Sequence, residues 1–315
     1  WGVLIGGIVQ LLFQIPFLIK IRKLPRLAHG DHPSVKTLKK RMLPALFGVS
    51  VSQINLLIDT MIATVLVSGS VSWLYYSDRL LELPLALIGI ALATVALAKL
   101  SKHYANKDEQ KFTRTVDYAL KVGLLLGAPA CAGLLLLAEP LIITLFQYEE
   151  FDAFAAHMSA LSLTAYGSGL MAFIMVKILA PVFLARGDTK TPVKVGVIAM
   201  VSNVFLNIVF AYYYEHVGLA IATSISAVIN ASLLYYYLNK QSIYQFSDDL
   251  IKLFLKVLLA SSIMVIFILN FSNDINFYLE NGVWQRITSV ASTIIASAAL
   301  YFACLRLLGI RIKQL

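Results

Sequence analysis

Charged residues are scarce in this 315-residue chain. Asp, Glu, Lys and Arg together make up 14% of it, whereas soluble globular domains usually carry about 25%. Apolar residues make up 59%, and the mean hydropathy is +0.79. Too few polar side chains remain to cover the surface of a water-soluble protein of this size. The composition therefore excludes a soluble globular domain and predicts an integral membrane protein.

Cysteine and the familiar catalytic motifs are also scarce or missing. Cys131 and Cys304 are isolated within apolar runs, which excludes a disulfide framework or a thiolate metal site and predicts two buried small hydrophobes. His29 and His32 form an H-x-x-H pair, but no third ligand follows at a suitable spacing. The sequence has no phosphate-cradling loop and no H-E-x-x-H motif. Nothing in it indicates an ATPase or an intramembrane hydrolase, and we expect no cofactor beyond a coupling ion.

The apolar residues fall into blocks of roughly 20, the length that a helix needs to cross about 30 Å of hydrocarbon. The chain opens inside such a block, with no initiator Met and no basic residue before it, so we expect it to be a piece of a longer polypeptide. The predicted fold class is an all-α integral membrane protein with about nine transmembrane helices. The nine spans are 1–19, 43–67, 71–100, 118–138, 157–184, 193–214, 217–238, 252–270 and 286–308.

Basic residues are distributed unevenly between the connections. Alternate connections and the C-terminal tail, counted with the span ends that adjoin them, hold 23 of the 26 Lys and Arg residues. The four intervening connections hold none; these are 68–70, 139–156, 212–218 and 271–285. Because basic residues gather on the cytoplasmic side of membrane proteins, the basic set and the C-terminus are predicted to be cytoplasmic. Topology and attraction to anionic lipid headgroups then account for the formal charge of +9. Nucleic acid is not an expected partner.

The longest basic connection divides the chain. Pro25, Gly30 and Pro33 mark residues 20–41 as a linker. We therefore expect a leading helix at 1–19, the linker at 20–41, a six-helix unit at 42–238, and a trailing helix pair with its tail at 239–315.

Two basic residues lie well inside predicted spans, away from both ends, and a charge costs about 3 kcal/mol or more at the helix centre. Arg79 has Glu82 at i,i+3, so a local ion pair is one interpretation. We favour the other, in which Arg79 lines a water-filled cavity with Asp78 and Glu82 beside it and binds an anionic substrate, because guanidinium binds phosphate in a bidentate way. Lys177 is about seven residues from the inner end of its span, so it either snorkels to the cytoplasmic surface or joins that substrate site.

Polar side chains at a matched depth suggest a second site. Asp59 is about 12 Å of helix from the outer end of its span, Asn203 and Asn207 share a helix face at i,i+4, and Thr223 is at a similar depth on the next span. Carboxylate, amide and hydroxyl oxygens suit a small hard cation such as sodium. Interhelical hydrogen bonding, or a proton on Asp59, would explain the same residues.

Five segments, in order along the chain, resemble one family. They are GVSVSQI at 48–54, SGSVSWLYYSDRL at 68–80, LFQY at 145–148, VKILAP at 176–181 and TKTPVK at 189–194. They are similar to the MurJ (MviN) family of bacterial lipid II flippases, which belongs to the multidrug/oligosaccharidyl-lipid/polysaccharide exporter superfamily. The sequence departs from the family pattern at Leu85-Ala86 and at Ala98-Lys99.

The resemblance implies fourteen helices in the intact protein, arranged as two six-helix lobes around a cationic cavity and a trailing pair that forms a groove for a lipid tail. This chain would supply the last helix of the N-terminal lobe, the whole C-terminal lobe and the trailing pair. Its implied partners are lipid II, membrane lipids and the N-terminal lobe of the same protein. The implied activity is non-enzymatic, alternating-access translocation of lipid II across the bacterial inner membrane for cell wall synthesis. Arg79 falls on a cavity arginine of the family, and Asp59, Asn203, Asn207 and Thr223 fall where some relatives place sodium.

Three alternatives remain open on the sequence. A related exporter could move a drug or another polyprenyl-linked saccharide. A polyprenyl-phosphate transferase would need paired carboxylates and a divalent metal, for which Asp248-Asp249 is the candidate, although their place after Ser247 at a helix start is explained by capping. A membrane scaffold would leave Arg79 without a role.

Overall fold

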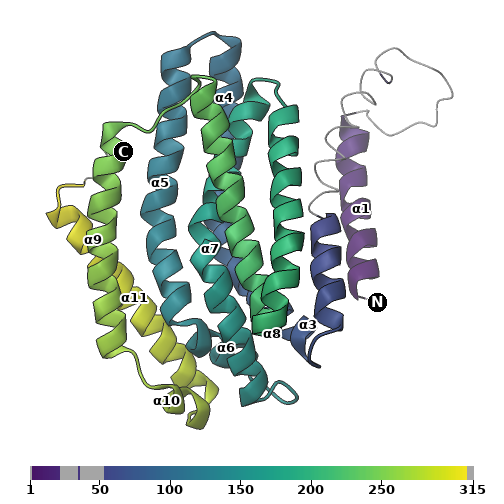
Figure 1. Ribbon diagram of the computed structural model, residues 1–315, viewed down its shortest axis with the longest axis vertical. Coiled ribbons are helices and arrows are strands. Elements are labelled where there is room, and N and C mark those ends of the chain that lie inside the picture. The colour runs from purple at the N-terminus through teal and green to yellow at the C-terminus, as the bar shows by residue number, and fades with distance from the viewer. Residues whose placement is uncertain (1, 22–34, 36–52, 311–315) are drawn as a thin grey trace. The chain divides into compact units, whose positions relative to one another are not determined.

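The computed structural model describes residues 2–21, 35 and 53–310, and within these ranges every regular element is a helix. Residues 53–64 are helical. In chain order the labelled elements are α1 (Gly2–Lys20), α3 (Ser70–Pro84), the π-helix η1 (Leu85–Ile90), α4 (Ala91–Ala105), α5 (Glu109–Leu136), α6 (Ala138–Phe146), α7 (Ala153–Ala185), α8 (Lys190–Lys240), α9 (Asp248–Phe271), α10 (Ile275–Glu280) and α11 (Val283–Leu307) (Figure 1). The all-α prediction is confirmed.

The number of spans differs from the prediction. Six helical segments in the described part of the chain are long and apolar enough to cross a membrane, and a shorter apolar helix covers Leu4–Lys20. The count of nine is therefore not confirmed. Two reasons are visible: the predicted span at 43–67 begins outside the described residues, and α8 joins two predicted spans in one 51-residue element.

The break in α8 is at Glu215, whose φ of 49° and ψ of −131° are not helical. It separates two arms that fold back on each other (Figure 1), since Ser226 Oγ of the second arm donates to the carbonyl of Ala199 in the first at 2.7 Å. A Cβ on Gly218 would lie 2.2 Å from the carbonyl oxygen of Phe210, so only glycine fits at this turn. The break falls between the spans predicted at 193–214 and 217–238.

The chain separates into two compact units, residues 1–43 and 44–315. In the first unit the structure describes α1, which contains Pro16 and ends with Lys20. The predicted linker at 20–41, with Pro25, Gly30, Pro33 and the His29–His32 pair, lies almost entirely outside the described residues. The predicted boundaries at 42 and 239 stay predictions.

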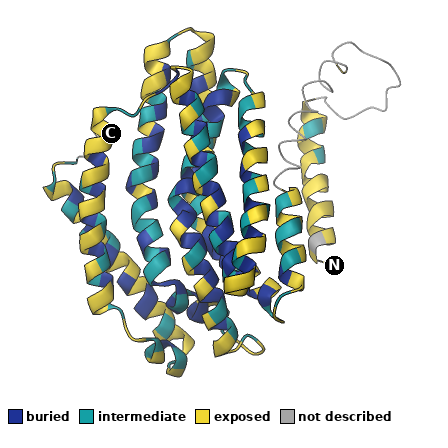
Figure 2. Cartoon of the chain, viewed as in Figure 1, coloured by how far each residue is buried: buried dark blue, intermediate teal, exposed yellow. Residues whose placement is uncertain are grey.

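In the second unit α7 is central, because it packs against α3, η1, α4, α5, α6 and α8. Figure 2 shows buried residues gathered on the inner helices and exposed residues along α9 and α11. Small residues permit the closest contacts, as is common between membrane helices. A Cβ on Gly169 of α7 would lie 2.9 Å from Ser224 Cα of α8. The backbones of α7 and α8 therefore lie so close together at Gly169 that a residue with a Cβ would not fit there.

The π-helix η1 follows Pro84 directly. Proline has no N–H and its ring clashes with the carbonyl four residues before it, which disturbs the regular hydrogen bonding of an α-helix. Here the chain continues as a short π segment, a form of helix that is frequent at functional sites.

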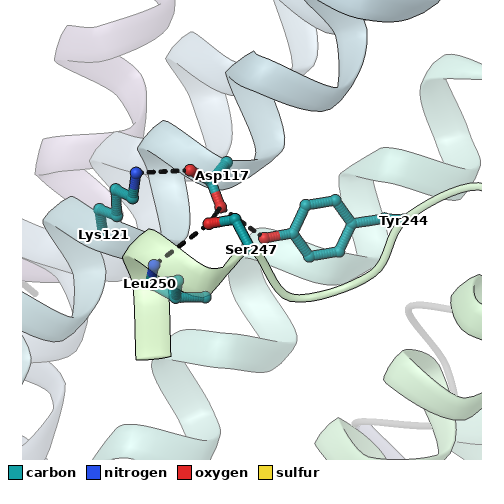
Figure 3. Close-up of polar contacts among 5 residues, drawn as sticks. All are labelled: Asp117, Lys121, Tyr244, Ser247 and Leu250. Carbon is teal, nitrogen blue, oxygen red and sulfur yellow. Dashed lines mark hydrogen bonds and ion pairs between the residues drawn. The ribbon is translucent and has the colours of Figure 1, made fainter. Parts of the chain in front are cut away.

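Polar contacts fix the trailing helices to the rest of the unit. Asp117 of α5 accepts hydrogen bonds from Tyr244 Oη at 2.9 Å and Ser247 Oγ at 2.6 Å, and its other oxygen is 2.7 Å from Lys121 Nζ (Figure 3). Ser247 also caps α9 by accepting from the Leu250 N–H at 3.1 Å. We call Asp117, Lys121, Tyr244 and Ser247 the α5–α9 clasp.

Two further bonds act on α11. Tyr301 Oη donates to the carbonyl of Leu125 in α5 at 2.8 Å, and Lys256 Nζ of α9 donates to the carbonyl of Leu308 at the end of α11 at 2.8 Å. Lysine at a helix C-terminus satisfies a carbonyl that has no intrahelical partner. The trailing pair is thus hydrogen-bonded to α5 at two places, through the α5–α9 clasp and through Tyr301. A further hydrogen bond joins α9 to the end of α11.

Candidate functional site

Arg79 projects from an exposed face of α3. Its Nη1 lies 2.8 Å from Glu82 Oε2, and the two side chains are 52% and 54% exposed. The guanidinium carbon is 4.8 Å from the centre of the Tyr75 ring. The i,i+3 pair with Glu82 is therefore present, and it engages one edge of a group that has five N–H donors. Half-exposed, Arg79 remains accessible to a second anion.

The predicted substrate-binding residues do not form one cluster. Asp78, Arg79 and Glu82 are neighbours on α3, but Lys177 projects from α7 into a cavity of about 660 Å³ that Arg79 does not line. The stem of Lys177 packs close to Gly89 of η1, where an added Cβ would lie 3.4 Å from Lys177 Cβ and Cγ. The sequence gives the position of each residue along its helix, but the direction in which its side chain faces depends on how the helices pack.

Asp59, Asn203, Asn207 and Thr223 do come together. Asn207 Nδ2 donates to Asp59 Oδ1 at 2.5 Å and lies 2.9 Å from Asn203 Oδ1. Asn203 Nδ2 lies 3.2 Å from Thr223 Oγ1. We call these four residues, with Asn55, the Asp59 cluster.

Asn55 is a member that the sequence interpretation missed. Its Nδ2 donates to Asp59 Oδ2 at 3.2 Å from one turn earlier on the same helix. The i,i+4 spacing from Asp59 was a signal that could have identified it.

The Asn203 amide satisfies the hydrogen bonding of both its polar atoms when it is reversed. Reversed, it donates to Asp59 Oδ1 at 3.1 Å and to Asn55 Oδ1 at 3.0 Å, and its oxygen accepts from Thr223 Oγ1 at 3.2 Å. In either orientation Asn203 connects Thr223 with Asp59, directly or through Asn207. The cluster is therefore one continuous hydrogen-bonded network.

One acceptor in this network is unused. Asn207 is fully buried, and its Oδ1 has no hydrogen-bond partner among the described residues. Buried polar atoms are nearly always hydrogen-bonded, so an unpartnered one calls for an explanation. A free amide oxygen is a ligand of the kind that a small hard cation takes.

A second cavity, of about 740 Å³, lies between α5, α7 and α9 and is lined almost entirely by apolar side chains. Leu120, Phe246 and Leu250 line it near the α5–α9 clasp, and Val265 lines it further along α9. No residue of α11 lines it. The sequence did not predict the clasp, because Tyr244 and Ser247 belong to a connection without periodicity.

Both cysteines are partly buried and free. Cys131 lines this apolar cavity, and its Sγ donates to the carbonyl of Gly167 at 3.2 Å. Both cysteines are therefore less buried than the sequence predicted.

Asp248 and Asp249, the residues that a transferase would need, are exposed in the first turn of α9 behind the Ser247 cap. Acidic residues at a helix N-terminus are stabilised by the helix dipole. In the described ranges no group of three or more His, Cys, Asp or Glu side chains is placed to hold a metal ion.

Comparisons with known proteins give a consistent picture. The family model described as "Lipid II flippase MurJ" matches residues 1–284. A probable lipid II flippase MurJ from Vibrio cholerae serotype O1 is 45% identical over 315 residues, which is 100% of this chain and 60% of that protein. A probable lipid II flippase MurJ from Haemophilus influenzae is 45% identical over 98% of this chain and 62% of that protein. The chain thus spans about 60% of the length of these relatives.

Solved structures agree with this result. A structure of lipid II flippase MurJ in an inward closed conformation aligns with a TM-score of 0.72 at 28% identity, covering 96% of this chain and 61% of that one. An outward-facing multidrug resistance MATE family transporter of the MOP superfamily aligns with a TM-score of 0.58 at 19% identity, over 84% of this chain and 62% of that one, and shares the fold. From the extent of the family match and the identity to these relatives, the chain belongs to the MurJ family.

Proposed function

We propose that the intact protein is a lipid II flippase that moves this lipid-linked peptidoglycan precursor from the cytoplasmic to the periplasmic leaflet of the bacterial inner membrane. The observation that carries the proposal is the family match over residues 1–284. The chain supplies about 60% of the length of its relatives, so the activity belongs to a protein that also contains an N-terminal lobe. The C-terminus is cytoplasmic in this proposal. Translocation makes and breaks no covalent bond, so the protein is a transporter and not an enzyme.

In this proposal Arg79 binds the pyrophosphate of the lipid head. The side chain is half-exposed, and its pairing with Glu82 holds the guanidinium without burying it. A planar guanidinium can form two parallel hydrogen bonds to a phosphate, which an ammonium cannot. Asp78 and Glu82 set the local charge around Arg79. Alternating exposure of the cavity between the two lobes then carries the head across.

The polyprenyl tail stays in an apolar environment during the same movement. The cavity between α5, α7 and α9 lies among three of the membrane-spanning candidates and is almost wholly apolar. Exposing the tail to water would cost about 0.8 kcal/mol per CH₂. In this proposal the apolar surface of the trailing helix α9 spares the tail that cost while the head is held elsewhere.

The Asp59 cluster is the proposed coupling site. Asp59, Asn203, Asn207 and Thr223 would hold a sodium ion, which is supported by the unpartnered Asn207 Oδ1; a proton on Asp59 is the other coupling chemistry open to the same residues. A bound cation supplies a charge that responds to the membrane potential, worth about 2.3 kcal/mol per elementary charge at 100 mV.

The function is tested by complementation. Cells depleted of their own flippase should recover growth when they make the intact protein, and their lipid-linked precursor should fall to the level of undepleted cells. A protein that reaches the membrane at normal levels, yet leaves the precursor accumulated and the cells lysing, would show that the substrate is different.

A further inference from the structure

The cavity that contains Lys177 leads to the Asp59 cluster. Its lining includes Asn55, Asn203 and Thr223, three members of the cluster. The three helical stretches that form most of its wall contribute residues at i,i+3 and i,i+4 spacings, so each turns a single face toward it. The cluster is therefore the inner end of this cavity.

The other end of the cavity lies at the connection between α7 and α8. Leu184 and Thr189 line it there. Thr189 and Asn203 are 14 residues apart on or next to the first arm of α8, which corresponds to about 21 Å of helix. Arg186 and Lys190 flank this end, so the distribution of basic residues places it on the cytoplasmic side.

Lys177 is about halfway along this route. It is seven residues before Leu184 on α7, or about 10 Å of helix. Of the residues that line the cavity in the described part of the chain, Lys177 alone is charged. Within the same ranges no carboxylate lies within 4.0 Å of its Nζ. Among the residues that the structure describes, no ion pair therefore neutralises the charge that Lys177 brings to the cavity.

We propose that this cavity is the route by which a cation passes between the cytoplasmic side and the Asp59 cluster, and that Lys177 is the electrostatic barrier in that route. This inference rests on the coupling role proposed for the cluster. It removes Lys177 from the lipid-head site and gives it a separate task.

A barrier of this kind serves a transport cycle, because a coupling ion has to leave its site as well as enter it. The Asp59 carboxylate attracts the cation, and the ammonium of Lys177, about 10 Å nearer the mouth, weakens that attraction. Two charges 10 Å apart change an equilibrium by about 2- to 15-fold as the effective dielectric constant falls from 80 to 20. Replacing Lys177 with a neutral residue should therefore tighten cation binding by about 2- to 15-fold.

Thiol labelling tests the route and the barrier. In the intact protein, with all native cysteines replaced by serine, Asn230→Cys places a thiol in the cavity wall seven residues from Thr223. Vesicles of known orientation are treated with a cationic and a neutral thiosulfonate of similar size. We expect labelling from the cytoplasmic side, and a cationic-to-neutral rate ratio that rises at least about 2-fold on Lys177→Gln. Lys177→Arg keeps the charge and should leave the ratio unchanged.

Lys194→Gln is the matched control, because Lys194 is on the first arm of α8 but does not line the cavity. Labelling only from the outer side would overturn the route. An unchanged rate ratio in Lys177→Gln, or an equal rise in Lys194→Gln, would overturn the barrier.

A second measurement separates this inference from the coupling proposal. Thermal stability of the detergent-solubilised intact protein is followed in sodium against potassium at constant ionic strength. If sodium stabilises the wild type and not Asp59→Asn, Lys177→Gln should lower the half-saturating sodium concentration by about 2- to 15-fold. If sodium has no specific effect while the labelling ratios change as expected, the sodium proposal fails and the route with its barrier stands.

Discussion

Asn207 Nδ2 lies 2.5 Å from Asp59 Oδ1, although 148 residues separate the two in the chain. The contact joins the helix over residues 53–64 to the first arm of α8 in the interior of the unit. The other polar atom of the Asn207 amide, Oδ1, has no hydrogen-bond partner among the described residues. Asn207 therefore links Asp59 to Asn203 through its Nδ2 atom and still has an oxygen available to a ligand.

Replacing Asn207 with Leu should destabilise the protein by about 1–3 kcal/mol, because Asp59 would lose its donor in a buried setting. Asn207→Asp keeps the oxygen and should retain or strengthen any stabilisation by sodium. Thermal unfolding in matched sodium and potassium buffers measures both effects. Equal melting temperatures for wild type and Asn207→Leu would contradict the role given to this contact.

Gly169→Ala should destabilise the contact between α7 and α8. The new Cβ would lie 2.7–2.9 Å from Ser224 atoms, including its Cα, and overpacking of this kind costs about 1–3 kcal/mol. Gly133→Ala, on α5, is the control, since no atom lies within 4 Å of its Cβ position. Thermal unfolding should separate the two variants; if both behave like wild type, the two backbones do not need the glycine.

The α5–α9 clasp should control the order of the start of α9. Asp117→Ala removes an acceptor shared by Tyr244 and Ser247 and leaves Lys121 without its partner. We expect faster amide hydrogen exchange over residues 244–254 and a loss of about 1–3 kcal/mol. Asp249→Asn, exposed in the first turn of the same helix, should exchange nearly as wild type does. Unchanged exchange in Asp117→Ala would show that the clasp does not hold the helix.

The connection before α8 should be sensitive to acid. Partial burial of Asp188 raises the pKa of its carboxyl, but hydrogen bonds from the Thr191 hydroxyl and from the N–H groups of Thr191 and Lys190 lower it further, so that the pKa is below its ordinary value. The stabilisation is then present above the unfolded pKa of about 3.9 and is lost as pH falls through the folded value. The melting temperature should fall less on acidification in Asp188→Asn than in the wild type. Parallel curves for the two proteins would argue against a stabilising role of the hydrogen bonds to Asp188.

The sequence was sufficient to predict the all-α fold class and the residues of one polar cluster. Asp59, Asn203, Asn207 and Thr223 were matched by depth alone, and the structure brings them together. Their role as a cation site stays a prediction.

Features that depend on packing could not be read from the sequence. Arg79 and Lys177 were both predicted to bind the substrate, but the rotation of α3 and α7 is set by contacts between many helices, and of the two only Lys177 lines the cavity of about 660 Å³. The α5–α9 clasp depends on where an irregular connection lies. The π-helix after Pro84 is a local response to proline that no hydrophobic period indicates.

The most direct test of the flippase proposal uses Arg79. The intact protein carrying Arg79→Lys or Arg79→Ala is produced in cells depleted of their own flippase, and membrane level, precursor accumulation and growth are recorded, with Arg306→Ala on the predicted cytoplasmic side as the control. We predict normal membrane levels for all three variants, with precursor accumulation and lysis for both Arg79 variants and normal growth for the control. Normal growth of Arg79→Lys and Arg79→Ala would contradict the account, because the guanidinium would then have no part in transport.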